Sequence, residues 1–202
     1  MTFLAQGDLA AARAVLKANV ESTALVAYMA AYNDLVWVLD EEQRQLLLRL
    51  TPSAFDDDKG IWGLCVTQAS VLAGDTAAAR THADAARKAL EEQATATPND
   101  GTVRAELGLS LAYLGRKEEA TREGRRGVEL LPVTRDAYTG AYIQHQLARI
   151  YILVGEPEKA LDQLEPLLKM PYFLSPGWLK IDPNFDPLRS NPRFQKLVAG
   201  AK

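Results

Sequence analysis

Residues 107–132 read LGLSLAYLGRKEEATREGRRGVELLP, and they carry the clearest indication of how the chain folds. Its apolar first part ends at Gly115, a residue that readily takes the left-handed conformation with which many helices end. Ala120 follows five residues later, at a helical position. A small side chain there lets a second helix approach the first closely, and Gly108 adds a second close contact. The stretch therefore predicts a tight hairpin of two helices, closed by Pro132.

The same arrangement recurs along the chain with a nearly regular period. Its marks stand at positions 7, 40, 74, 115 and 155, so that successive intervals are 33, 34, 41 and 40 residues. Each full mark combines a glycine with an alanine five residues later: Gly7 with Ala12, Gly74 with Ala79, Gly115 with Ala120, and Gly155 with Ala160. Three aspartates at or after the marks are expected to cap the following helix by accepting its first free N–H groups: Asp8, Asp40 and Asp75. Repeats of this length predict a series of helical hairpins.

The pattern Leu107-Gly108…Gly115…Ala120…Pro132 resembles a tetratricopeptide repeat, whose period is about 34 residues. The resemblance implies an all-α fold, a right-handed solenoid of helical hairpins. It also implies a surface for binding proteins or peptides, without a reaction centre.

The likeness varies along the chain. It is good for residues 103–132, fair for 60–92 and 143–171, and poor for 22–52. In the poor unit Asp40 replaces the glycine and Gln45 replaces the small alanine, so we expect a splayed hairpin. The two longer intervals predict helices extended by about two turns, one ending before Pro98 and one starting near Thr134.

Residues 172–202 differ from the repeats at 1–171 and are expected to form a capping segment on the last hairpin of the same domain. Three cap-plus-proline pairs predict short helices: Ser175-Pro176, Asp186-Pro187 and Asn191-Pro192. Six apolar side chains would cover the exposed end of the solenoid: Trp178, Leu179, Phe185, Leu188, Phe194 and Leu197. Pro166, inside the last repeat helix, is expected to kink that helix toward the cap.

The capping segment also resembles the closing segment of tetratricopeptide regions at the C-terminus of bacterial serine/threonine kinases and of winged-helix or cyclase-type regulators. This resemblance implies that the chain is the C-terminal regulatory or partner-recruiting domain of a bacterial signalling protein. Residues 1–6 correspond only to the tail of a first repeat helix, so we expect the first repeat to be incomplete and the chain to be part of a longer protein.

Several kinds of chemical site are not expected. The chain has one cysteine, Cys65, and two histidines, which leaves no internal disulfide and no cysteine-rich metal cluster. Kinase motifs, a P-loop and a His-Glu-x-x-His motif are absent from the sequence. We therefore expect no enzyme activity, no cofactor and no metal. Cys65 is expected to be buried, His82 to lie on the outer face of a second helix, and Asp56-Asp57-Asp58 to lead into a helix rather than hold a cation.

The candidate binding site is the concave groove lined by the first helices of the hairpins. Positions registered on the glycines give the expected peptide groove: Asp34, Trp37, Gln68, Tyr113, Tyr142, His145 and Arg149. An aromatic and polar trough suits an extended or helical peptide, and Tyr142, His145 and Arg149 are expected to form one exposed stripe. In the alternative interpretation some groove positions are core, among them Trp37, Leu64, Leu72 and Leu153. The Lys/Asn carboxylate clamp of chaperone-binding tetratricopeptide domains is not matched.

Charge and hydropathy bear on the partner. Residues 1–101 hold 8 Lys+Arg against 14 Asp+Glu, and residues 102–202 hold 15 against 12. Acidic and basic side chains interleave in 116–126, as on a solvated helix face, so we expect a protein or peptide partner and no nucleic acid. The alternative is structural self-association, in which the acidic half of one copy docks on the basic half of another.

No run approaches the roughly 18 apolar residues of a membrane span, and the predicted location is cytoplasmic, or alternatively periplasmic as part of a membrane-anchored regulator.

Overall fold

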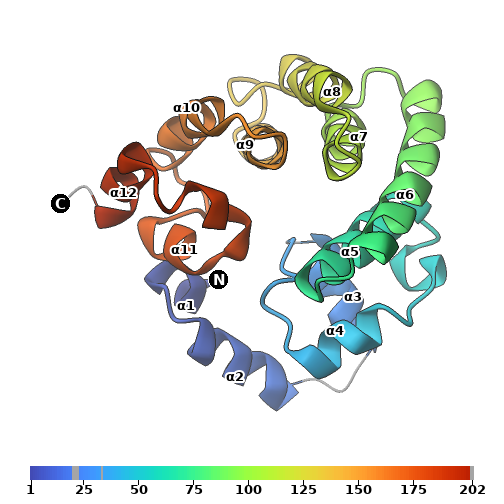
Figure 1. Ribbon diagram of the computed structural model, residues 1–202, viewed down its shortest axis with the longest axis horizontal. Helices are drawn as coiled ribbons and strands as arrows, with labels where there is room; N and C mark the ends of the chain where they lie inside the picture. The colour runs from blue at the N-terminus through green and yellow to red at the C-terminus, as the bar shows by residue number, and fades with distance from the viewer. Residues whose placement is uncertain (20–22, 33, 201–202) are drawn as a thin grey trace.

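The structure is a computed structural model that describes residues 1–19, 23–32 and 34–200, and every regular element in these ranges is a helix. The elements are α1 (Thr2–Gln6), α2 (Leu9–Asn19), α3 (Thr23–Tyr32), α4 (Glu41–Leu47), η1 (Pro52–Phe55), α5 (Lys59–Leu72), α6 (Thr76–Ala96), α7 (Gly101–Tyr113), α8 (Lys117–Leu130), α9 (Thr139–Leu153), α10 (Pro157–Leu167), α11 (Pro176–Ile181), η2 (Pro183–Leu188) and α12 (Pro192–Ala199). They form a solenoid that curves into a ring (Figure 1). The predicted all-α helical solenoid is confirmed.

Four helices end at a left-handed glycine, as the period predicted. The φ angles of Gly7, Gly74, Gly115 and Gly155 lie between 75° and 81°. At each of these four glycines the N–H donates to the carbonyl three residues earlier, and the next N–H donates to the carbonyl five residues earlier. This is the Schellman motif. One local signal therefore turns the chain at every full mark.

The aspartate caps are also confirmed. The N–H groups of Ala11, Gln43 and Ala78 donate to the carboxylates of Asp8, Asp40 and Asp75, respectively, at 2.9, 3.0 and 2.9 Å.

Small residues let the helices of each regular pair approach closely. A Cβ atom at Gly108 would lie 2.8 Å from the backbone N of Gly124 and 2.9 Å from the carbonyl oxygen of Ala120. Ala120 and Ala160 are themselves fully buried. The predicted contact sites therefore hold α7 against α8, and α9 against α10.

One of the two predicted helix extensions is present. α6 continues to Ala96 and ends before Pro98, as expected. The extension near Thr134 is wrong, because α9 begins only at Thr139. The Asp136 carboxylate accepts the N–H groups of Tyr138 and Thr139 at 2.9 and 2.8 Å, so the helix starts there and the extra residues remain in the connection.

The second unit departs furthest from the repeat. α3 and α4 pack much less closely than α5 with α6, α7 with α8 or α9 with α10, as the missing glycine predicted, and Gln45 is exposed. Between them the non-helical segment 34–39 enters the ring, and all its residues after Asp34 are buried. The prediction that Asp34 and Trp37 lie on a first helix is therefore wrong, since α3 ends before them and Asp34 has a φ of 52°. Positions 22 and 33 of this unit lie outside the described residues.

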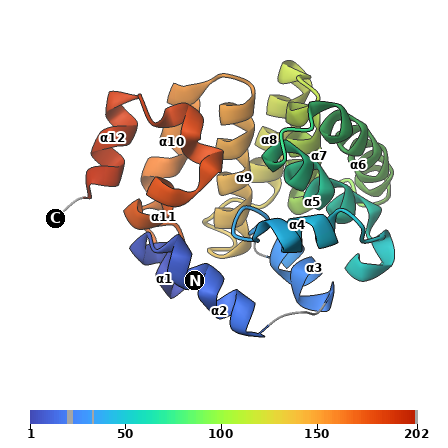
Figure 2. The same cartoon turned by 60° about the horizontal axis from the view of Figure 1, so that its bottom comes forward.

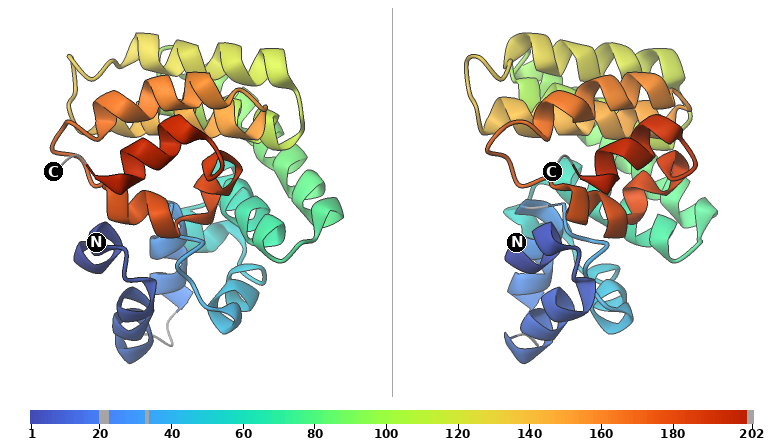
Figure 3. Two further views of the ribbon diagram at one scale, coloured as in Figure 1. Left: turned by 60° about the vertical axis from the view of Figure 1, so that its left-hand side comes forward. Right: turned by 90° about the vertical axis from the view of Figure 1, so that its left-hand side faces the viewer.

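The two ends of the chain pack against each other, with α1 beside α11 (Figures 2 and 3). The Ser175 hydroxyl donates to the Ala5 carbonyl at 2.7 Å. Gly177 leaves room for this contact, because any Cβ there would overlap the Ala5 carbonyl oxygen. On the other side, Arg13 Nε donates to the Val38 carbonyl at 2.9 Å and so ties α2 to the buried segment. Sequence reasoning did not predict this closure.

The capping segment covers α9 and α10 with η2 and α12. Of the six predicted apolar side chains, Leu197 is partly buried and the other five are buried: Trp178, Leu179, Phe185, Leu188 and Phe194. Ser175 and Asn191 cap their helices as predicted. Positions 201 and 202 of this segment lie outside the described residues.

Two details, one in the capping segment and one in α10, differ from the prediction. Asp186-Pro187 lies inside η2 and does not start a helix. The start is at Asp182, whose carboxylate accepts the Asn184 N–H at 2.8 Å. Pro166 stands one residue before the last residue of α10, Leu167. It therefore lies where the helix ends, and not in mid-helix, where a proline would kink it.

Candidate protein-binding site

Asp34 lies at the centre of the ring, where side chains of α5 and α9 converge on its carboxylate. Gln146 Nε2 donates to it at 2.6 Å, and Arg149 Nη1 lies 3.3 Å from it. Gln68 Nε2 approaches to 3.5 Å from α5. A carboxylate from the segment 34–39 is thus bound by the first helices of two different repeats.

Arg149, on α9, also connects α9 to α5, and its side chain is only 3% exposed. Its Nη2 donates to Gln68 Oε1 at 3.0 Å and to the Tyr113 hydroxyl of α7 at 3.4 Å, and its Nη1 donates to Gln146 Oε1 at 3.1 Å. Its Nε is buried and has no acceptor among the described residues. Burial lowers the pKa of Arg149, but Asp34 and, to a smaller extent, Tyr113, Asp182 and Tyr142 together outweigh burial, and the pKa is raised. The guanidinium is therefore a charged and paired group.

The structure brings together five of the seven predicted groove residues in one polar network: Asp34, Gln68, Tyr113, Tyr142 and Arg149. Burial raises the pKa of Tyr142 well above its usual range. These residues form a polar core rather than an open trough, because the segment 34–39 fills the concave side. Gln146 completes the network but was not predicted, since its role depends on a segment outside the repeat register.

His145 lies beside this network, in an aromatic cluster. Its ring stacks on Phe185 at a centroid distance of 6.0 Å, and its Nδ1 lies 3.3 Å from the Tyr172 hydroxyl. Burial, with a smaller contribution from Arg149, lowers the pKa of His145 to about 3. The predicted exposed stripe is therefore wrong for His145 and Arg149, both of which are covered by the capping segment or by the segment 34–39.

Trp37 is buried in the apolar core where the segment 34–39 meets the capping segment. Its indole packs edge-to-face against Trp178 at 5.6 Å. The alternative interpretation of groove positions as core is thus confirmed for Trp37 and Leu64, which are buried. It is wrong for Leu72 and Leu153, whose side chains remain exposed.

Apolar side chains remain accessible at the ends of the first helices. Leu72, Tyr113 and Leu153 each stand two residues before the glycine that follows α5, α7 or α9. Equivalent positions of stacked repeats recur along one edge. Leu72 is 38% exposed and Leu153 40%, while Val71, next to Leu72, is 46% exposed. We refer to Val71, Leu72, Tyr113 and Leu153 as the rim.

A pocket of about 70 Å³ opens at the rim, and we refer to it as the rim pocket. It is lined by Trp37, Gln68, Val71, Leu72, Tyr113, Pro183 and Asn184. Three of these are predicted groove residues: Trp37, Gln68 and Tyr113. Pro183 and Asn184 were missed because they come from the capping segment, and no sequence signal shows that this segment reaches across the concave side.

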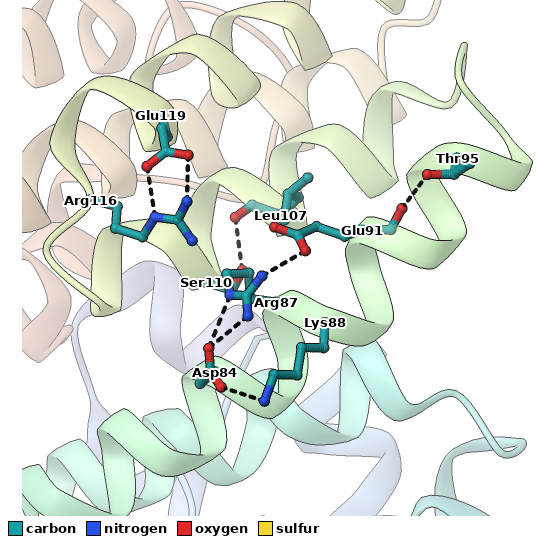
Figure 4. Close-up of polar contacts among 9 residues, drawn as sticks. All are labelled: Asp84, Arg87, Lys88, Glu91, Thr95, Leu107, Ser110, Arg116 and Glu119. Atoms are coloured by element: carbon teal, nitrogen blue, oxygen red, sulfur yellow. Dashed lines mark hydrogen bonds and ion pairs between the residues drawn. The ribbon is translucent and has the colours of Figure 1, made fainter.

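The outer faces of α6 and α8 are charged, but neighbouring side chains pair with each other. Arg87 binds Asp84 and Glu91 on α6, and Arg116 binds Glu119 beside α8 (Figure 4). Pairs of this exposed type contribute little to stability. They make solvated helix faces, as the interleaved charges at 116–126 predicted.

The remaining chemical candidates have structural roles. Cys65 is buried as predicted, and burial raises the pKa of its thiol. Asp58 accepts the N–H groups of Gly60 and Ile61 at 2.8 and 3.0 Å, so the acidic run leads into α5 as predicted. His82 is half-buried and packs edge-on against Trp62.

The described part of the chain holds neither a candidate metal site nor a candidate membrane span. No group of three or more His, Cys, Asp or Glu side chains there could hold a metal ion. No helix in that part is long and apolar enough to cross a membrane.

Comparison with known proteins gives one result. A tetratricopeptide-repeat family model matches residues 1–18 and 141–166, which correspond to α1 with most of α2 and to most of α9 and α10. No curated protein and no solved structure matches the chain. The two matches and the repeated glycine-ended hairpins support a tetratricopeptide-repeat domain. Such repeats generally mediate protein–protein interaction and are typically non-catalytic.

Proposed function

We propose that the chain is a non-catalytic scaffold that binds a peptide or a protein segment along the rim. The exposed apolar side chains of Leu72 and Leu153, at equivalent positions of the α5 and α9 repeats, carry this proposal. A partner that covered Leu72 and Leu153 would gain on the order of 1 kcal/mol from each side chain. The deeper groove is not offered to a partner in this proposal, since the segment 34–39 already occupies it.

The experiment is a selection of phage-displayed random peptides on the immobilised protein, followed by fluorescence-polarisation titration of the enriched peptides. We expect Leu72→Asp and Leu153→Asp to weaken binding by about tenfold or more each, since loss of about 1.4 kcal/mol is a tenfold change. Tyr138→Asp is the matched control, because Tyr138 is an exposed apolar side chain at the opposite end of α9. Failure to enrich any peptide, or equal binding by all three variants, would overturn the proposal.

The resemblance to bacterial regulators supports a proposal about the protein to which the domain belongs. We propose a single domain made of repeats at 1–171 and a cap at 172–202, within a bacterial signalling protein whose partner is a protein rather than a nucleic acid. Head-to-tail self-association of the acidic and basic halves has less support, because the ends of the chain contact each other within one copy. Sedimentation velocity at low and high salt tests it: a salt-sensitive dimer would favour self-association over the scaffold.

A further inference from the structure

We propose that the rim pocket binds a single uncharged aliphatic side chain of the partner, of about the size of valine. This proposal rests on the proposed function, since it specifies the anchor residue of the same partner. The repeat helices alone do not form the pocket, because part of its lining comes from irregular segments of this chain. Trp37 from the segment 34–39 and Pro183 from η2 complete walls that α5 and α7 would otherwise leave open.

The volume of the pocket sets the size of the anchor. Its volume is about 70 Å³. One water molecule occupies about 30 Å³ of liquid, and a cavity of roughly 150 Å³ accommodates benzene. The rim pocket therefore has room for two or three carbon groups and none for an aromatic ring.

The chemistry of the walls sets the polarity of the anchor. Val71, Leu72, Trp37 and Pro183 present apolar surface. An aliphatic side chain gains free energy there because apolar surface leaves water on both sides.

The floor of the pocket offers no free charge. Gln68 and Tyr113 both accept hydrogen bonds from Arg149, which is paired in turn with Asp34. The remaining guanidinium nitrogen, Nε, is buried. A carboxylate anchor would lose its hydration and find no unpaired cation, so the pocket selects against it.

Asn184 supplies a polar contact at the edge of the pocket. Its Nδ2 donates to Asp182 Oδ1 at 2.8 Å, while its side-chain carbonyl accepts no hydrogen bond from the described residues. An amide carbonyl in this place can accept the backbone N–H of the residue that supplies the anchor. The side chain then fixes the register of the peptide at the rim.

The test uses capped amino acids as probes, so that it needs no identified partner. Protein labelled with ¹⁵N is titrated with the N-acetyl, N′-methylamide derivatives of valine, phenylalanine and aspartate. We expect the valine derivative to shift the indole N–H signal of Trp37 and the side-chain amide signals of Asn184 in a saturable way. We expect the other two derivatives to cause no saturable shift. Equal shifts by the aspartate or phenylalanine derivative would overturn the proposal.

Two variants locate the binding. Val71→Asp places a charge at the mouth of the pocket on an exposed position and should abolish the shifts. Leu153→Asp makes the same change on the rim outside the pocket lining and should leave them unchanged. Retention of the shifts in Val71→Asp would also overturn the proposal, and the amide spectrum of each variant reports whether it is folded.

The selected peptides separate this proposal from the proposed function. If they bind through Leu153 but tolerate both Val71→Asp and replacement of every aliphatic residue, the scaffold function stands and the anchor is wrong. If the valine derivative binds but no peptide is enriched, the pocket stands and the scaffold function falls. If an enriched peptide loses about tenfold or more in affinity when one aliphatic residue is changed to aspartate, both are supported.

Discussion

The regular hairpins from α5 to α10 and the centre of the ring are stabilised in different ways. The hairpins pair helices that follow each other in sequence, through glycine and alanine contacts such as that of Gly108. The centre joins residues 112 positions apart, through hydrogen bonds and an ion pair on Asp34. Short-range packing can therefore be read from a repeat, whereas the central network depends on the path of one irregular segment.

The largest expected effect is at the centre. Arg149→Met leaves the partly buried Asp34 carboxylate beside Gln68 without its buried cation, and removing one partner of a buried pair costs about 3–5 kcal/mol. The free energy of unfolding, measured by urea denaturation at pH 7, should fall by that amount. Arg122→Met, on an exposed face of α8, is the control and should change stability by less than about 0.5 kcal/mol. Equal effects of the two variants would mean that the central network contributes no more than a surface pair.

The hairpin contacts come next. Gly108→Leu should overpack α7 against α8 and cost about 1–3 kcal/mol, and Ala120→Leu should do the same from the facing helix. Glu118→Leu adds a similar side chain to an exposed position of α8 and serves as the control. Thermal unfolding compares the three variants. An unchanged melting temperature in both hairpin variants would contradict the close contact at Gly108.

The aromatic cluster predicts a pH dependence of stability. Because the pKa of His145 is lowered to about 3 in the folded chain, the unfolded chain binds one more proton from about pH 6.5 downward. Stability should therefore fall as the pH falls, by about 2 kcal/mol between pH 6.5 and pH 5 from this residue.

Urea denaturation at the two pH values measures this dependence. His145→Gln should remove that part of the slope, and His82→Gln, at a half-buried position outside the cluster, is the control for loss of a histidine. An identical slope in the wild type and in His145→Gln would show that the histidine is not held in its neutral form.

The smallest expected effect is at a repeat glycine. A Cβ at Gly115 would meet no atom within 4 Å, so the cost of Gly115→Ala comes only from the left-handed backbone conformation. That cost is about 1 kcal/mol. Gly115→Asn should cost less, because asparagine adopts this conformation more readily. Differential scanning calorimetry resolves the order of the three proteins, and equal stability of the alanine and glycine forms would contradict the Schellman ending.

Most of the helices were predictable because their ends carry local signals. Gly115 ends a helix and Asp75 begins one through contacts within a few residues, so no distant part of the chain is needed. The errors fall where two local signals compete. Asp182 rather than Asp186 starts η2, since both precede a proline and only packing of the tail decides between them.

Several residues of the candidate site could be predicted from the sequence, but their burial in a polar core could not. Registration on the glycines identified Gln68, Tyr113 and Arg149, which do lie close together. It could not show that Asp34 leaves its helix and binds them, because the repeat pattern is lost in that unit. Because the segment 34–39 covers the concave side, the expected groove residues lie in a core, and only the rim stays exposed.

The repeat period, the helix ends and the small-residue contacts could be predicted from the amino-acid sequence alone, because these features depend on backbone conformation and on neighbours within one hairpin. By contrast, the contact of α1 with α11 and the filling of the concave side by the segment 34–39 depend on how distant parts of the chain pack together. The Ser175 hydroxyl and the Ala5 carbonyl are 170 residues apart. Nothing in either residue specifies that pairing, which follows from the curvature accumulated over all the repeats between them.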